Sequence, residues 1–389
     1  MNKYFDYAAT VPLSDFSNIS YLLEEYKGQP SMFGNPSCTH ELGFKSSKWL
    51  QKSRKIIANA LNCSPEEIIF TSGGSESDNM AIKGIMLKYK PSEAEMITSQ
   101  IEHPAVLNTC RQLEKWGYVI KYIKPNKYGT INPEDIEKEV NSKTKLISIM
   151  AINNELGTLE PIYSIAHLAH THGITFHTDA VQSVGNIDLN LSTIIDMASF
   201  SGHKFGGLKG TGFLYKKIYI KLEPLICGGG QENNYRSGTE NVLGNYIMAE
   251  SLQNYYNKWN GEAISTMLSE TEKFVKDLQF EFKENIIINS PSNRVPNIIN
   301  VAFKYIDSET LQLMLSNKGY MVSTGSACHS GSNTPSHVLT AIGVPKEFEH
   351  GALRISLSPD IRYNELDNLK DEIIFHVKYL LNKEEKNGN

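Results

Sequence analysis

The feature that most limits the fold of this chain is a repeated pattern in its first half, in which a short apolar run ends in polar residues and a helix follows. Such runs are predicted as strands at 67–71, 96–99, 145–150 and 173–179. Buried strands that alternate with helices are typical of an α/β domain with a mostly parallel sheet. Ligands bind such sheets beyond the carboxyl ends of the strands, which is where the polar residues of this chain collect.

The first of these strand ends is rich in glycine. Strand 67–71 runs into Ser72-Gly73-Gly74-Ser75, and a helix is predicted to follow through Met86, with Ser75 as its N-cap and Asp78 as the capping partner. Backbone N–H groups and the helix dipole attract phosphate at such a turn. A tight connection without a ligand fits the same residues, and no GxxxxGK[ST] or GxGxxG motif is present to indicate a nucleotide.

Three further strand ends carry a histidine, an asparagine and an acid. His103 precedes Pro104, which is predicted to be the first residue of a helix, so His103 is either a ligand-binding residue or a cap. Asn154 follows strand 145–150. Asp179 ends the next strand, where a buried acid is costly unless a basic group pairs with it. A protonated pyridine nitrogen would be such a group, and an ordinary helix N-cap is the alternative.

A lysine lies in a glycine-lined turn farther along. The apolar run 194–198 is predicted as a strand that leads to Ser201-Gly202-His203-Lys204, with more glycines through Gly212. Burial favours a neutral lysine, and a neutral amine can form a Schiff base with a carbonyl cofactor. A phosphate-contacting loop and a surface turn remain alternatives. Together the strand ends supply a phosphate turn, a flat polar side chain, an acid and a lysine, which is the set that pyridoxal phosphate requires.

Charge and cysteine content exclude several other classes. The net charge of −5 gives no support to direct nucleic-acid binding. The five cysteines include no CxxC pair, which argues against a disulfide framework and against a structural metal site. The residues from Met1 onward do not resemble a signal peptide and no apolar run is long enough to span a membrane, so no membrane partner is expected and a cytoplasmic location is predicted.

Motifs along nearly the whole chain then carry a family resemblance. They are Asp6-Tyr7-Ala8-Ala9-Thr10, His177-Thr178-Asp179-Ala180, Ser201-Gly202-His203-Lys204, Arg236-Ser237-Gly238-Thr239 and Gly325-Ser326-Ala327-Cys328. In combination they resemble the cysteine desulfurases, which are pyridoxal-phosphate enzymes of fold type I in the class V aminotransferase family. The resemblance implies a large domain at 13–255 with a mostly parallel seven-stranded sheet flanked by helices. It also implies a small α/β domain formed by 1–12 and 256–389, which carries a catalytic cysteine loop at about 323–335.

The resemblance also implies roles for individual residues. Lys204 would form the Schiff base, Asp179 would bind the pyridine nitrogen, Gln182 would bind the phenolic oxygen, and His103 would stack on the ring and move protons. The phosphate would be held by Gly74, Ser75, Ser201 and His203, with Thr239 contributed by the second subunit of a homodimer. Asn154, which also contacts the cofactor, and Arg354 would bind the substrate carboxylate, with Asn35 nearby.

Cys328 is the residue that separates this family from ordinary aminotransferases. Its thiolate would attack the sulfur of L-cysteine, release L-alanine and keep the sulfur as a persulfide for an acceptor protein. A helix that begins at Thr334-Pro335 and ends at Gly343 is predicted to follow the loop. The Cys328-His329 pair also resembles selenocysteine lyases, so L-selenocysteine is an alternative substrate. A plain transaminase or lyase, or a carrier with a vestigial site, would not need Cys328. Acceptors in iron–sulfur cluster assembly, tRNA thiolation and DNA phosphorothioation all remain open.

Overall fold

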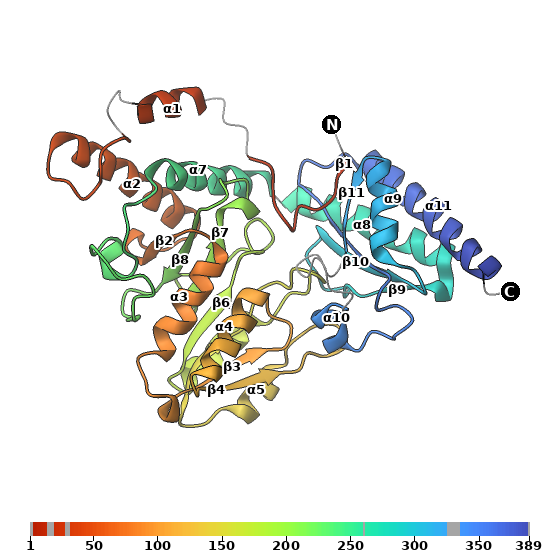
Figure 1. Ribbon diagram of the computed structural model, residues 1–389, viewed down its shortest axis with the longest axis horizontal. Helices are drawn as coiled ribbons and strands as arrows, with labels where there is room; N and C mark the ends of the chain where they lie inside the picture. The colour runs from red at the N-terminus through yellow and green to blue at the C-terminus, as the bar shows by residue number, and fades with distance from the viewer. Residues whose placement is uncertain (1–2, 14–18, 28–31, 260, 325–334, 388–389) are drawn as a thin grey trace.

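The larger part of the molecule is built on a seven-stranded sheet (Figure 1). The computed structural model describes residues 3–13, 19–27, 32–259, 261–324 and 335–387. The sheet has the order β2-β8-β7-β6-β5-β3-β4, and β8 runs against the other strands. Its strands are β2 (Ile68–Thr71), β3 (Glu95–Ser99), β4 (Val119–Ile123), β5 (Thr144–Ser148), β6 (Thr175–Asp179), β7 (Met197–Ser201) and β8 (Gly212–Lys216). The mostly parallel α/β fold is therefore confirmed.

Helices cover both faces of this sheet. Successive side chains of a strand point to opposite faces, and the apolar side chains on each face are buried under a layer of helices. In β2, Ile69 packs in the same cluster as Met80 of α3 (Gly74–Met86), whereas Phe70 packs in the core on the opposite face. Helix α4 (Pro104–Lys115) lies beside α3. The opposite face is covered by α2 (Glu41–Ala60), α6 (Ile162–Thr171) and α7 (Val242–Lys258), and α5 (Pro133–Glu139) packs on α6.

A second, smaller sheet lies beside the first, with the order β12-β13-β10-β9 (Figure 1). Its strands are β9 (Ile286–Ile288), β10 (Ile298–Phe303), β12 (Ser323–Thr324) and β13 (Ala352–Ser356). Next to it lie α8 (Gly261–Phe282), α9 (Ser308–Asn317), α10 (His337–Ile342) and α11 (Tyr363–Asn387), and α1 (Ile19–Lys27) lies near α2 and α7. Among the described residues, every helix is too short or too polar to cross a bilayer.

The N-terminal segment connects the two sheets. Strand β1 (Lys3–Tyr4) pairs in parallel with β11 (Tyr320–Met321), and Asp6 bridges to Ser356 at the end of β13. A few residues later, the Val11 N–H donates to the carbonyl of His203 at 2.8 Å. The segment therefore passes from the small sheet to the turn that carries Lys204.

Two of the predicted caps and one predicted strand differ from the structure. Helix α3 begins one residue before Ser75 and has Gly73 as its N-cap, so the prediction of Ser75 as the cap is wrong. The helix after the cysteine loop is capped by Ser336, two residues beyond the predicted Thr334, which lies outside the described residues; Gly343 ends it as predicted, with φ of 79°. The strand predicted at 194–198 begins only at Met197 and continues to Ser201, and the side chain of the buried Asp196 before it accepts the Phe176 N–H at 2.9 Å.

Candidate active site

A cavity of about 670 Å³ lies at the carboxyl ends of the parallel strands. Strands β2, β6 and β7 all deliver residues to it, because their carboxyl ends meet at one edge of the sheet. The walls include ten of the residues that the sequence singled out: Gly74, Ser75, His103, Asn154, Asp179, Gln182, Ser201, His203, Lys204 and Arg354. Residues from distant parts of the chain therefore share one space.

The glycine turn after β2 forms one end of this cavity. Gly73 has a φ of 153°, a backbone conformation that favours glycine. A Cβ on Gly74 would lie 2.7 Å from Cγ2 of Val181 and 3.4 Å from Cβ of Ser201, so the backbone here approaches its neighbours closely. Because the first N–H groups of a helix lack intrahelical acceptors, the start of α3 offers donors to an anion in the cavity. Ser201 and His203 line the same space.

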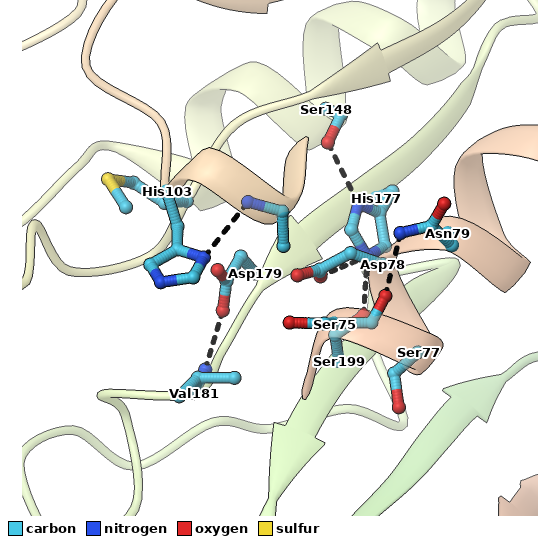
Figure 2. A network of polar contacts seen from close by, with 12 residues as sticks. Ser75, Ser77, Asp78, Asn79, His103, Ser148, His177, Asp179, Val181 and Ser199 are labelled. Atoms are coloured by element: carbon cyan, nitrogen blue, oxygen red, sulfur yellow. Dashed lines mark hydrogen bonds and ion pairs between the residues drawn. The ribbon is translucent and has the colours of Figure 1, made fainter. Parts of the chain in front are cut away.

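Asp179 lies on the face of β6 that points toward α3, together with His177 two residues earlier (Figure 2). His177 is fixed by the hydroxyls of Ser148 at 2.8 Å and Ser199 at 2.9 Å, and Asp179 Oδ1 accepts the Val181 N–H at 2.9 Å. This contact closes a turn and does not cap a helix, because no helix begins in the described residues between β6 and β7, so the alternative of an N-cap at Asp179 is wrong.

Burial sets the charges in this cluster. It lowers the pKa of His177 to about 3, so this imidazole is neutral at pH 7. Burial also raises the pKa of Asp179 to about 6. On α3, Asp78 lies 3.8 Å from Nε2 of His177, and burial together with the Asp179 charge raises its pKa well above the ordinary value. With a pKa of about 6, Asp179 is ionised at pH 7 and carries the negative charge that a cationic ring nitrogen would attract.

His103 is both a cap and a wall of the cavity. Its Nδ1 accepts the Ala105 N–H at 3.1 Å and so caps α4, which begins at Pro104 as predicted. Burial, and secondarily the charge of Lys204, lower the pKa of His103 to about 4. The ring is therefore neutral at pH 7.

Lys204 ends the short turn after β7, and its amine points to the N-terminal segment. Its Nζ donates to the carbonyl of Ala8 at 2.6 Å, and the Gln182 side-chain amide donates to the same carbonyl at 2.9 Å. The Lys204 amine and the Gln182 amide therefore share one acceptor, the Ala8 carbonyl oxygen. This contact joins residues that are 196 positions apart in the chain.

Arg354 occupies the wall formed by the small sheet. It lies on β13 and is buried, with Nη1 donating to the Asn154 carbonyl at 3.0 Å and Nη2 donating to Asp6 Oδ1 at 2.7 Å. A guanidinium group held in this way presents a fixed positive charge to the cavity, which is what recognition of a carboxylate requires.

Three predicted residues are not placed at the cavity. Asn35 lies in an exposed turn, where its side chain accepts the Ser37 N–H at 2.9 Å. Thr239 is exposed on a loop outside the cavity of its own chain. Cys328 and the surrounding positions 325–334 lie outside the described residues.

Several residues that line the cavity were not predicted to do so, among them Ala8, Glu76, Asp78, Glu155 and Thr324. Asp78 was interpreted only as the capping partner of Ser75. Glu155 follows Asn154 in the sequence, and its place in the polar stretch after strand 145–150 was the available signal. Ala8 contributes a backbone carbonyl, which no side-chain pattern reveals.

The residues present fit pyridoxal phosphate. The cradle at Gly73 and Gly74 suits a phosphate, the buried Asp179 suits a cationic ring nitrogen, and Lys204 supplies an amine for an aldehyde. No cluster of three or more metal-binding side chains occurs in the part of the chain that the structure describes.

Comparisons with known proteins agree with this chemistry. The model of the Aminotransferase class-V family matches residues 3–369. A cysteine desulfurase IscS from Dictyoglomus turgidum is 43% identical over 358 residues, which cover 91% of this chain and 89% of that protein. Among solved structures, a NifS-like protein superposes with a TM-score of 0.88 at 34% identity, covering 97% of this chain and 100% of its own. SspA in complex with cysteine superposes with a TM-score of 0.80 at 37% identity, covering 92% and 99%.

Proposed function

Because the chain belongs to the aminotransferase class-V family and is a pyridoxal-phosphate-dependent cysteine desulfurase, we propose that Lys204 holds the cofactor and that Cys328 takes the sulfur from L-cysteine. The observation that carries the first assignment is the convergence of Lys204, Asp179, His103 and the glycine turn on one cavity. The second assignment rests on the motif around Cys328.

The cofactor-binding residues divide by the part of the group that each would hold. Gly74, Ser75, Ser201 and His203 would bind the phosphate, Asp179 the ring nitrogen and Gln182 the phenolic oxygen, with Asn154 also in contact and His103 stacked on the ring. When bound, pyridoxal phosphate supplies a ring that withdraws electrons from the substrate. Asp179 would keep the ring nitrogen protonated, because its own ionisation is favoured by a cation beside it.

Substrate binding would depend on Arg354 and Asn154. The fixed guanidinium of Arg354 would pair with the carboxylate of L-cysteine, and Asn35 is proposed to lie nearby once the site is complete. SspA, which superposes well on this chain, has been solved in complex with cysteine. The amine of Lys204, or alternatively His103, would accept the proton that leaves the substrate.

Sulfur transfer would take place at Cys328. Its thiolate attacks the sulfur of the substrate, a sulfur–sulfur bond forms, and the carbon–sulfur bond breaks. The electron pair stays with the carbon, which is protonated to give alanine, and Cys328 keeps the sulfur as a persulfide. A protein acceptor would then take the sulfur, in iron–sulfur cluster assembly or in a thiolation pathway.

Domain organisation and assembly are part of the same proposal. We assign 13–255 to a large cofactor domain, and 1–12 with 256–389 to a small domain, which fits the crossing of residues 3–11 between the two sheets. A homodimer would bring the exposed Thr239 to the phosphate of the partner subunit. The described cysteines Cys38, Cys63, Cys110 and Cys227 are free, which suits the reducing cytoplasm as the proposed location.

The test compares alanine production from L-cysteine by wild type, Lys204→Ala and Cys328→Ser, each reconstituted with pyridoxal phosphate. The proposal predicts turnover by wild type alone. If Cys328→Ser still forms alanine at the wild-type rate, the protein uses another route, as a selenocysteine lyase or a plain lyase would, and the assignment of Cys328 is wrong.

A further inference from the structure

A buried carboxyl group connects the cavity to the C-terminal boundary of the segment that contains Cys328. Glu155 is 8% exposed and lines the cavity, and its Oε2 accepts a hydrogen bond from the hydroxyl of Ser336 at 2.6 Å. Ser336 is itself buried, and it is the second described residue after positions 325–334. A residue two positions beyond that segment is thus bound to a wall of the active site.

Ser336 has two separate roles at this boundary. Its oxygen accepts the N–H groups of Val338 at 3.1 Å and Leu339 at 3.4 Å and so caps α10. Its single hydroxyl proton is directed to Glu155. An N-cap needs only the acceptor, so the bond to Glu155 is an additional contact that the start of a helix does not require.

The opposite boundary of the segment is attached to the same wall. In β12, Ser323 pairs with Arg354 and Thr324 pairs with Leu353 of β13, and Thr324 lines the cavity. Next to Ser336, the imidazole of His337 lies 3.0 Å from the carbonyl of Glu102. On both sides of positions 325–334, the neighbouring described residues therefore contact Arg354 or residues that lie near it.

Glu155 is also held firmly and lies close to that arginine. Arg354 donates to the carbonyl of Asn154, the preceding residue, and the Asn300 side chain donates to the Glu155 carbonyl at 3.3 Å. Burial raises the pKa of Glu155 to about 7, while the Ser336 hydrogen bond and the charge of Arg354 act in the opposite direction. The Glu155 carboxyl group therefore interacts with both Arg354 and Ser336.

We propose that Glu155 is a positioning residue for sulfur transfer, which fixes the C-terminal boundary of the Cys328 segment against the wall that binds the substrate carboxylate. Glu155 touches no reacting atom in this account and acts through Ser336. The inference rests on the proposed role of Cys328 as the sulfur acceptor.

The experiment compares Glu155→Gln with Glu155→Met. Both variants remove the charge and have similar length, but only glutamine keeps an oxygen that can accept from Ser336. Three quantities are measured: the single-turnover rate of persulfide formation at saturating L-cysteine, the Kd for L-cysteine in a Cys328→Ser background, and amide hydrogen exchange of residues 335–343 in the cofactor-free chain. Thr340→Val is the control, because it removes a hydroxyl that bonds the Ser336 carbonyl at 3.0 Å without touching Glu155.

Loss of this hydrogen bond should slow persulfide formation in Glu155→Met about tenfold relative to Glu155→Gln, which corresponds to about 1.4 kcal/mol. The Kd for L-cysteine should change by less than about threefold, which corresponds to well under 1 kcal/mol. Exchange of residues 335–343 should rise in Glu155→Met and stay near wild type in Glu155→Gln. Thr340→Val should keep its persulfide rate.

Equal persulfide rates in the two Glu155 variants would overturn the proposal, whether or not amide exchange differs, because Glu155 would then be structural only. A higher Kd for L-cysteine with an unchanged persulfide rate would overturn the proposal as well, because Glu155 would then be a substrate-binding residue. Alanine formation by Cys328→Ser would instead contradict the proposed function. The exchange measurement does not depend on that function, so the two failures are distinguishable.

Discussion

Arg354 and Asp6 form an ion pair of 2.7 Å that joins the last strand of the small sheet to the N-terminal segment. The pair is 348 residues apart in sequence, yet it fixes the guanidinium that faces the cavity. Asp6 leads directly to Ala8, whose carbonyl accepts from Lys204. The N-terminal segment thus orients both the cation for the substrate and the amine for the cofactor.

Asp6→Asn should therefore weaken cysteine binding. Asparagine keeps one oxygen but loses the charge that holds Arg354, and a charge-assisted hydrogen bond contributes about 1.5–3 kcal/mol, so KM should rise about tenfold. The value of kcat should change much less, because the pair does not touch the reacting sulfur. Steady-state kinetics checks this, with Asp360→Asn at the exposed ion pair to Lys258 as the control. An unchanged KM would show that Arg354 is oriented without Asp6.

Glu102→Gln should change how stability depends on pH. Burial raises the pKa of Glu102 to about 8, so between its unfolded value and pH 8 the folded protein binds the extra proton and stability falls as pH rises. Glutamine has no such ionisation. Between pH 5 and 8, the free energy of unfolding of the variant should rise relative to that of wild type by up to roughly 1.4 kcal/mol per pH unit.

Denaturant unfolding of the cofactor-free proteins at pH 5.5 and 7.5 measures this difference. The histidines with lowered pKa values are common to both proteins, so their contributions cancel. A stability difference that is the same at both pH values would mean that Glu102 is ionised in the folded protein.

Asp179→Asn should reduce cysteine turnover about 100- to 1000-fold, since a neutral amide cannot stabilise a protonated ring nitrogen at the point where charge develops. The side chain keeps its shape and can still accept the Val181 N–H, so the fold should persist. Turnover and circular dichroism are measured together, with Asp188→Asn on the surface as the control. Turnover within about threefold of wild type would exclude Asp179 as the ring-nitrogen partner.

Thr239→Val tests the proposed dimer. Thr239 is exposed on its own chain and outside its own cavity, so its hydroxyl should matter only if a partner subunit receives it. Sedimentation should give a dimer for both proteins, and the variant should lose pyridoxal phosphate about tenfold faster, as expected for one lost hydrogen bond to a charged group. A monomeric wild type would contradict the assignment.

The sequence predicted the parts of the site that depend on local pattern. The position of Asp179 followed from an apolar run that ends in an acid, and Lys204 followed from a glycine-lined turn after another such run. Parallel strands bring their carboxyl ends to one edge, so these residues could be expected to meet before any coordinates were known.

Contacts over long sequence separations could not be predicted in this way. No spacing rule indicates that Glu155 reaches Ser336 or that Arg354 reaches Asp6, because each bond joins segments that are far apart in the sequence and meet only in the folded chain. Asp78 was interpreted only as a capping partner. Its burial near Asp179 could not be predicted, because it depends on where α3 packs on the sheet. The roles of Cys328 and Thr239 came from resemblance alone and remain proposals.

The most direct test of the account is to locate the transferred sulfur after a single turnover with L-cysteine. Protein loaded with pyridoxal phosphate is mixed with less than one equivalent of L-cysteine, alkylated, digested and analysed by mass spectrometry. The account predicts an alkylated persulfide on the peptide that contains Cys328, in an amount equal to the alanine released. Alanine release with free sulfide and an unmodified Cys328 would contradict it.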